Sequence, residues 1–516
     1  MENSIYYVIT DIDRIQNYIF ATNLLKEIRG ASAILDEFGF EDDVKNRVSD
    51  YNGSLLYSGG GTIKAHFNDR SEAEEFVLNE MNILRQKSES ATLTAAVVKT
   101  TEYEIEKHFA KLNIRAEREL RKNKDAKHRS IELLAHPFIR MCDSCREYAA
   151  VIRYERDERP LLCNACKLKR ENSERTRLFG RFKDWVTKTV NGEDEKYNGW
   201  NLNDSIEYNI PEDLDKIGSL SDNYIGLIVC DGNRMGEKLK GINTTGSFEE
   251  FSRLIKNATA DALFNAIASN MKPINGMVPC EFIILGGDDL ACVVPAKHAI
   301  PVARDICRYF HQATISGAKG EHSEVSMSAG VAITHTKYPL VRLYTVADDL
   351  LKSAKRLSHA YFIQHQEVSC LDFSIISTTS TNPINIIRDK ELTCYPDKDY
   401  VLYRRPYRIF DKSGNNELKT LMDAIKGLKK DGFPKTKLNQ LYNAIQSKDR
   451  DQITFETRLI WFRLPEPQRE KITKLLIEQF TMEKSFPWQK VVIENKNKMP
   501  ITDLVELFDF IDEDTI

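Results

Sequence analysis

The stretch that decides the fold reads Phe282-Ile283-Ile284-Leu285-Gly286-Gly287-Asp288-Asp289-Leu290-Ala291-Cys292-Val293-Val294. Two short apolar runs flank a Gly-Gly step, and this pattern predicts a β-hairpin because glycine adopts positive φ angles freely. Asp288 and Asp289 follow the turn at once. Because unpaired carboxylates are costly to desolvate at the tip of buried strands, the pair indicates a bound cation. A loop that is merely acidic is the alternative.

A third carboxylate follows an upstream apolar run. Residues 224–230 read as a buried strand, which leads directly into Asp231-Gly232-Asn233-Arg234-Met235-Gly236. Small residues that connect a strand to a helix leave backbone N–H groups free to meet phosphate oxygens. The segment is therefore a candidate metal–phosphate site.

The surrounding elements predict how these motifs meet. A helical pattern precedes the hairpin, and a helix over 299–310, a strand over 326–333 and a further helix follow it. The order β-α-β-β-α-β is that of a ferredoxin-like fold, an α+β architecture. In that fold the end of the first strand lies beside the hairpin tip. We therefore expect Asp231 to lie close to Asp288 and Asp289.

The first 125 residues repeat this order. A strand over residues 5–10 ends in Asp11, and residues 55–65 form a hairpin. The turn of that hairpin consists of Gly59, Gly60 and Gly61. We interpret the segment as a duplicate of the later one, with two independent copies of a common fold as the alternative. Here Gly-Gly-Gly-Thr replaces Gly-Gly-Asp-Asp, so the hairpin carboxylates are absent, but a nucleotide can still approach the glycine backbone closely.

Four cysteines lie between the two copies. They form two CxxC pairs, which consist of Cys142, Cys145, Cys163 and Cys166. Two such pairs at this separation predict a tetrahedral zinc site, and four thiolates leave no open position for chemistry, so we expect the site to be structural. A redox CxxC pair or accidental cysteines are the alternatives. The basic run from Lys167 to Lys183 reads as a solvated helix face, with RNA phosphates as the alternative contact.

Length and composition set the frame. The chain has 516 residues, 41% hydrophobic and 29% charged, with a formal net charge of −4. This is typical of a soluble globular chain and does not indicate nucleic-acid binding by overall charge. No apolar run approaches the ~20 residues that span a bilayer, no signal peptide is apparent, and scattered cysteines favour a reducing cytoplasm.

The length predicts about three or four domains. We expect a first copy over 1–125, a zinc ribbon and linker over 126–205, a second copy over 206–385 and a C-terminal helical domain over 386–516. Residues 189–205 are rich in Asn, Gly and charge, as in a linker.

These features resemble the nucleotide-cyclase palm that diguanylate cyclases share with the large subunit of type III CRISPR effector complexes. The resemblance rests on Asp231-Gly232-Asn233-Arg234-Met235-Gly236, the Gly-Gly-Asp-Asp hairpin, the strand Ser328-Ala329-Gly330-Val331-Ala332-Ile333 and a helix ending in Ala354-Lys355. The form Gly-Gly-Asp-Asp favours the CRISPR subunit. The resemblance implies two palms that face each other across an ATP cleft, a zinc ribbon between them, and a helical domain that contacts small helical subunits.

The chemistry that we expect is nucleotidyl transfer from ATP. Two Mg²⁺ or Mn²⁺ ions would be held by Asp231, Asp288 and Asp289; strand alternation points the last two to opposite faces, so their individual roles stay open. Lys355 is the candidate for the triphosphate, ahead of Lys352 and Arg356. The full set of expected nucleotide-binding residues is Gly232, Asn233, Gly286, Gly287, Lys355, Gly59, Gly60 and Gly61. No Walker A loop is present, which argues against a P-loop ATPase.

The resemblance implies synthesis of cyclic oligoadenylate by a CRISPR complex with its other subunits, guide RNA and target RNA. A stand-alone cyclic dinucleotide synthase and an inactive ribonucleoprotein scaffold are the alternatives. No histidine is followed by aspartate, and the chain starts on a palm strand, so we expect no HD nuclease here.

Overall fold

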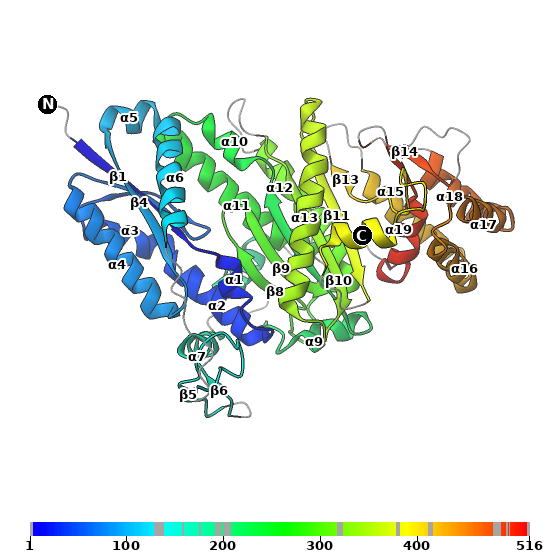
Figure 1. The fold of residues 1–516 in the computed structure, drawn as a ribbon, viewed down its shortest axis with the longest axis horizontal. Coiled ribbons are helices and arrows are strands. Elements are labelled where there is room, and N and C mark those ends of the chain that lie inside the picture. The colour runs from blue at the N-terminus through cyan, green and yellow to red at the C-terminus, as the bar shows by residue number, and fades with distance from the viewer. Residues whose placement is uncertain are drawn as a thin grey trace.

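The computed structural model describes residues 4–127, 139–156, 159–174, 177–190, 197, 200, 208–316, 324–377, 382–410, 416–477, 487–491, 494 and 496–512. Figure 1 shows the parts in a row: a first sheet at the N-terminal end, a larger sheet in the middle and a group of helices at the C-terminal end. A small cysteine-containing part lies below the first sheet. None of the helices in these described ranges is long and apolar enough to cross a membrane.

The first unit is a four-stranded antiparallel sheet with helices on both faces. Its strand order is β2-β3-β1-β4. Its elements are β1 (Ser4–Ile12), α1 (Ile15–Ile19), α2 (Leu25–Phe38), α3 (Glu41–Ser49), β2 (Ser54–Gly59), β3 (Thr62–Phe67), α4 (Arg70–Ser88), β4 (Leu93–Thr101), α5 (Glu102–Lys107) and α6 (Phe109–Ala126). Tyr7 packs in one core cluster with Phe109 of α6, and Val8 packs in another with Phe76 of α4. Strand alternation therefore buries both faces.

The second unit repeats the predicted order and extends it. Its elements are α9 (Leu214–Gly218), β7 (Tyr224–Gly232), α10 (Met235–Lys240), α11 (Thr245–Asn270), β8 (Glu281–Leu285), β9 (Asp289–Pro295), α12 (Ala296–Ser316), β10 (Met327–His335), α13 (Leu340–Ile363) and β11 (Ser369–Ile376). The strand order is β13-β11-β10-β7-β9-β8. Helices α11 and α12 pack on one face and α13 on the other. Gly330 allows α13 to approach, because a Cβ there would lie 2.1 Å from the carbonyl oxygen of Ala347.

Both units close the end of their first strand with the same backbone. Arg14 and Arg234 follow that strand in the left-handed conformation, with φ of 50° and 56°. Two backbone hydrogen bonds recur: Ile12 N to Gly61 O (3.0 Å) and Asp13 N to Thr92 O (2.8 Å) in the first unit, and Gly232 N to Asp288 O (3.0 Å) and Asn233 N to Ser326 O (2.8 Å) in the second. The repeat therefore extends beyond element order to individual atoms.

The glycine turns differ from the expectation in one respect. Gly60 and Gly61 have positive φ, as a Gly-Gly hairpin turn predicts, but Gly286 and Gly287 do not. The reason that we gave for Gly-Gly in the second hairpin was therefore wrong. Space is the physical reason: a Cβ on Gly286 would lie 1.8 Å from Oδ1 of Asp289, and one on Gly287 would lie 2.8 Å from the hydroxyl of Tyr57.

The two units are joined by a buried contact between α2 and β8. Nε of Arg29 donates to Glu281 at 2.9 Å, and both side chains are buried. The same guanidinium donates to the carbonyl of Pro211 at 2.8 Å, and Ser32 donates to the carbonyl of Ile283. Breaking a buried pair leaves an uncompensated charge, so this contact fixes the two sheets relative to each other.

The remaining parts are the cysteine module and the C-terminal segment. The module contains β5 (Ile152–Arg153), β6 (Leu161–Leu162), α7 (Asn164–Glu171) and α8 (Arg177–Thr189). Most of the expected linker over 189–205 lies outside the described residues, but Trp200 is buried and donates to the carbonyl of Ala268 in α11.

The C-terminal segment combines helices with short strands that the sequence pattern missed. It contains α14 (Ile384–Glu391), β12 (Tyr400–Val401), β13 (Tyr407–Phe410), α15 (Glu417–Lys430), α16 (Lys435–Gln446), α17 (Arg450–Phe462), α18 (Glu466–Ile477), β14 (Gln489–Val491), β15 (Lys496–Lys498) and α19 (Pro500–Leu507). Strand β13 pairs with β11 and so belongs to the second sheet. Strands of two to four residues carry too little alternation to be read from sequence.

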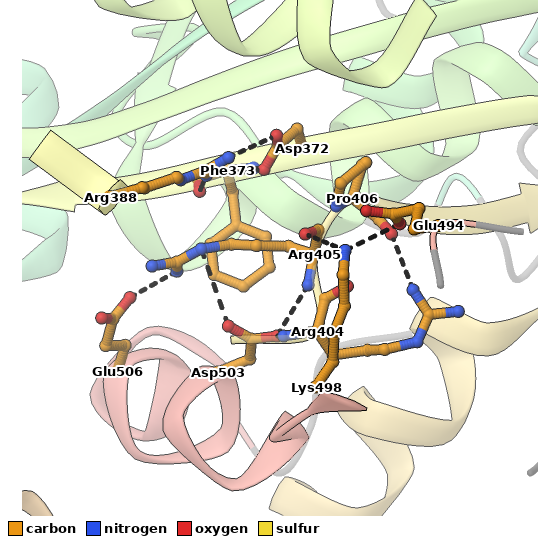
Figure 2. Close-up of polar contacts among 10 residues, drawn as sticks. All are labelled: Asp372, Phe373, Arg388, Arg404, Arg405, Pro406, Glu494, Lys498, Asp503 and Glu506. Atoms are coloured by element: carbon orange, nitrogen blue, oxygen red, sulfur yellow. Dashed lines mark hydrogen bonds and ion pairs between the residues drawn. The ribbon is translucent and has the colours of Figure 1, made fainter. Parts of the chain in front are cut away.

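A buried network of charges fastens this segment to β11 (Figure 2). Arg388 donates to both carboxylate oxygens of Asp372, at 2.7 and 2.8 Å, and the whole pair is buried. Arg405 pairs with Asp503 and Glu506 of the C-terminal helix region. Arg388 lowers the pKa of Asp372 against the effect of burial, which alone would raise it.

Replacement of Arg388 by Met should destabilise the protein by about 3–5 kcal/mol, because the carboxylate of Asp372 would stay buried without its partner. The measurement is the urea unfolding midpoint. The exposed pair of Arg70 and Glu74 supplies the control: Arg70→Met should leave the urea unfolding midpoint essentially unchanged. A double variant, Arg388→Met with Asp372→Leu, should recover much of the loss; equal instability of single and double variants would contradict this account.

Candidate functional site

Asp231 lies at the end of β7, where the antiparallel register pairs it with Asp289 at the start of β9. Cross-strand partners share a face of the sheet, so Asp231 and Asp289 point to the same side. Lys355, on the helix α13 that covers this face, places its ammonium 2.7 Å from Oδ2 of Asp231 and 3.0 Å from the carbonyl oxygen of Gly232. Carboxylate and carbonyl oxygens are also the ligands that Mg²⁺ prefers.

Asp288 is the carboxylate in closest contact with Asp231. Burial, followed by the charges of Asp231 and Asp289 and a hydrogen bond with Asp231, raises the pKa of Asp288 to about 8. Burial and the charge of Asp231 raise the pKa of Asp289 to about 6. Like charges held together in a partly buried site disfavour ionisation, and a divalent cation would relieve that repulsion. The carboxylate oxygens at this site therefore fit a divalent cation.

The three carboxylates do not all converge on one point. Among the described residues, only the four cysteines place metal-ligating atoms within 4.8 Å of one another in a group of three or more. Asp289 is set apart because its side chain turns back over Gly286, where an added Cβ would lie 1.8 Å from its Oδ1. The structure thus brings Asp231 and Asp288 into contact and holds Asp289 beside them.

The other residues predicted around Asp231 take distinct positions. Asn233 is buried, and its amide donates to the hydroxyl of Ser326 at 2.7 Å, which anchors the loop after β7. The helix that was expected to end at Lys355 continues to Ile363, so Lys352, Lys355 and Arg356 lie within α13. Of these three cations, Lys355 is the one that reaches Asp231, whereas Lys352 pairs with Asp348 at 2.6 Å on an exposed face.

Both glycine turns line a cleft of about 770 Å³. Its lining includes the turn residues Gly59, Gly60, Gly61, Gly286 and Gly287, together with Asp289. A Cβ on Gly60 would lie 3.6 Å from the backbone N of Gly287, so the two turns lie in van der Waals contact. Ile15, Ile19 and Leu35 supply apolar surface. The volume suits a nucleotide-sized ligand.

Three cations and four acids, Asp36, Glu41, Asp42 and Asp184, line the cleft beside Asp289, and the sequence did not assign them to it. Arg177 and Arg181 of α8 and Lys256 of α11 face it together with Asp36 of α2. Lys256 pairs with Glu41 at 2.8 Å. Burial raises the pKa of Asp36, and the three cations oppose that rise. The basic run of the sequence is thus divided. Its later part lines the cleft, whereas Arg170 is buried against Glu27 at 2.6 Å.

The first unit contains a neutralised counterpart of this site. Lys124 of α6 pairs with Asp11, as Lys355 pairs with Asp231. The hydroxyl of Thr62 donates to Asp11 at 2.9 Å, in the register position that Asp289 occupies in the second unit. Asp11 therefore faces the hydroxyl of Thr62 across the strands, whereas Asp231 faces the carboxylate of Asp289. Sequence patterns did not single out Lys124, because α6 ends among several lysines and arginines.

The four predicted cysteines form one cluster. Sγ of Cys145 and Sγ of Cys163 are 3.8 Å apart, the edge length of a tetrahedron with Zn–S bonds of about 2.3 Å. The cluster docks on α2 through Ser144 and Arg170, which both contact the buried carboxylate of Glu27. A metal there would stabilise the helix that lines the cleft.

The comparisons with known proteins agree with this arrangement. Residues 224–360 match the family model described as Cas10/Cmr2, second palm domain. A Csm1–Csm4 cassette in complex with AMPPNP matches with a TM-score of 0.53 and 14% identity, over 99% of this chain and 69% of that chain. Csm1 in T. onnurineus matches with a TM-score of 0.52 at the same identity and coverage. No curated protein sequence matches.

The family model therefore confirms the resemblance over residues 224–360, and nearly the whole chain shares its fold with these Csm1 structures. The chain spans 56% of the length of a Csm1–Csm4 cassette chain in complex with cA3, where the TM-score is 0.45, the identity 14% and the coverage of this chain 74%.

We expect one zinc ion per chain at the cysteine cluster. Cys163→Ser should remove it and lower the thermal midpoint, because four-cysteine sites contribute folding free energy directly. Zinc content by mass spectrometry and a thermal melt are the measurements. Cys394→Ser, at a buried cysteine outside the cluster, should leave the zinc content unchanged. Full zinc in the Cys163 variant would contradict the assignment.

Proposed function

We propose that this chain, whose residues 224–360 match the Cas10/Cmr2 second palm domain, is an ATP-dependent nucleotidyltransferase that makes cyclic oligoadenylate as the large subunit of a type III CRISPR complex. The single observation that carries the proposal is the pair of strand-end carboxylates, Asp231 and Asp288, held against each other beside a nucleotide-sized cleft. Such like-charge crowding is typical of metal-dependent active sites.

The proposed architecture has four domains. Two ferredoxin-like palms cover residues 1–125 and 206–385, a zinc ribbon and linker lie between them, and a mainly helical domain covers 386–516. The matching backbone at Arg14 and Arg234 supports a duplication.

In the proposed reaction, a ribose 3′ hydroxyl attacks the α-phosphorus of a second ATP. A 3′–5′ phosphodiester bond forms, the bond to pyrophosphate breaks, and the hydroxyl proton is released. Divalent ions, when bound by Asp231, Asp288 and Asp289, would activate the hydroxyl and stabilise the leaving pyrophosphate. The bare backbone of the two glycine turns would admit phosphate groups, which side chains at those positions would block.

The chain's cations would bind the triphosphate. Lys355 lies at the carboxylates, while Arg177, Arg181 and Lys256 line the cleft beyond them. In the first palm, Lys124 and Thr62 already satisfy Asp11, so we assign it nucleotide binding without chemistry. Structures of the same fold with AMPPNP and with pppApApA support adenine nucleotides as ligands, and the Csm1–Csm4 cassettes support a partner subunit.

The full chain, assembled with its complex and target RNA and supplied with ATP and Mg²⁺, should yield cyclic oligoadenylate detectable by mass spectrometry. Asp288→Ala with Asp289→Ala should abolish the product, leave the zinc content unchanged and not lower the thermal midpoint, because it removes like-charge repulsion. Undiminished synthesis by the double variant would refute the site. Synthesis without RNA would favour a stand-alone cyclase, and no product from the wild type under any condition would favour a scaffold.

Lys355→Met should weaken ATP-analogue binding in the presence of Mg²⁺ by about tenfold or more, because a charge-assisted hydrogen bond to phosphate contributes ~1.5–3 kcal/mol. Lys352→Met is the matched control on the same helix and should bind as the wild type does. Calorimetric titration measures both. Equal affinities of the two variants would contradict the role of Lys355.

A further inference from the structure

Tyr57 is a residue of the first unit that reaches the carboxylates of the second. It lies two residues before Gly59, in β2, where a β-bulge between Leu55 and Tyr57 shifts the register. Bulges change the direction of a side chain, and here the ring points toward α11 of the other unit. It packs edge-on against Phe248 of α11, with ring centroids 6.0 Å apart. The ring is thus supported from behind.

The hydroxyl of Tyr57 lies between the two glycine turns. A Cβ on Gly59 would lie 2.9 Å from the phenol oxygen, and one on Gly287 would lie 2.8 Å from it. Both distances are shorter than real Cβ contacts, so a side chain at either glycine would displace the hydroxyl from this position. Tyr57 therefore contacts the turn that carries Asp288 and Asp289.

The hydroxyl is a donor that the described part of the chain leaves unused. No described residue forms a hydrogen bond with it. Burial, and then the charges of Asp288 and Asp289, raise the pKa of Tyr57, so the phenol keeps its proton at neutral pH. A protonated phenol near carboxylates is a hydrogen-bond donor to them.

We propose that Tyr57 is a positioning residue for Asp288: its phenol O–H donates to that carboxylate when Asp288 holds a divalent ion. The inference rests on the proposed function, in which Asp288 is a metal ligand. Ligating carboxylates depend on hydrogen bonds from neighbouring groups to fix their orientation. The side chain of Asp288 lies against Gly232, since a Cβ there would be 3.1 Å from its Oδ2, and Tyr57 approaches the same turn from the opposite unit. The first unit thus completes the site of the second.

The test compares Tyr57→Phe, which keeps the ring and removes the hydroxyl, with Tyr51→Phe, a matched change in the same unit that packs on Phe76. Mn²⁺ binding to the full zinc-loaded chain is followed by electron paramagnetic resonance, and the carboxylate site is the fraction lost in Asp288→Asn. We expect Tyr57→Phe to weaken that Mn²⁺ site by about tenfold or more. ATP-analogue binding in EDTA and the thermal midpoint should stay unchanged, and Tyr51→Phe should alter none of these.

Two outcomes would overturn the inference. Unchanged Mn²⁺ affinity in Tyr57→Phe, or a loss confined to ATP-analogue binding in EDTA, would exclude positioning of Asp288 while leaving the proposed function intact. A wild-type chain with no Mn²⁺ site sensitive to Asp288→Asn would contradict the proposed function and the inference together. In turnover assays the hydroxyl should act on kcat rather than on KM for ATP.

Discussion

Repulsion between carboxylates at the tips of β7 and β9 is the constraint on which the site depends. The register pairs Asp231 with Asp289, and the turn brings Asp288 into contact with Asp231. The folded chain relieves part of this repulsion with the ammonium of Lys355 and leaves the rest. In the first unit the same backbone supports Lys124 and Thr62 instead, so Asp11 is fully partnered. The same fold thus carries a carboxylate with polar partners in the first unit and a group of mutually repelling carboxylates in the second. The carboxylates of the second unit are the ones that fit divalent ions.

The two units depend on each other through buried contacts. The pair of Arg29 and Glu281 fixes the edge strand β8 against α2, and the cleft lies beside that junction. Glu27 of the same helix is held by Arg170 from the cysteine module. The module, although far from the carboxylates along the chain, therefore stabilises a wall of the cleft. The first unit lacks hairpin carboxylates, but it still contributes to the site. It supplies Gly60 and α2 to the lining of the cleft, and Tyr57 to the turn that carries Asp288.

Sequence patterns recovered the elements that are long or chemically unambiguous. The glycine hairpins, the strand-end aspartates, the repeated element order and the four-cysteine cluster follow from local periodicity and fixed spacing. Sequence patterns missed the strands β12 to β15, because these strands are too short to show alternation of apolar and polar residues. The basic run after the cysteines was read as one surface, yet it splits between a buried ion pair at Arg170 and the cleft wall at Arg177 and Arg181.

The sequence by itself determined which residue types stand at the strand ends and turns, and hence that Asp231 would meet Asp288 and Asp289 beside bare glycine backbone. Only the tertiary structure decided the pairing of Lys355 with Asp231, the retreat of Asp289 over Gly286, and the approach of Tyr57 across the unit boundary. The physical reason is that strand and hairpin signals are local, whereas these contacts join residues more than 100 positions apart or depend on the space that one missing Cβ leaves.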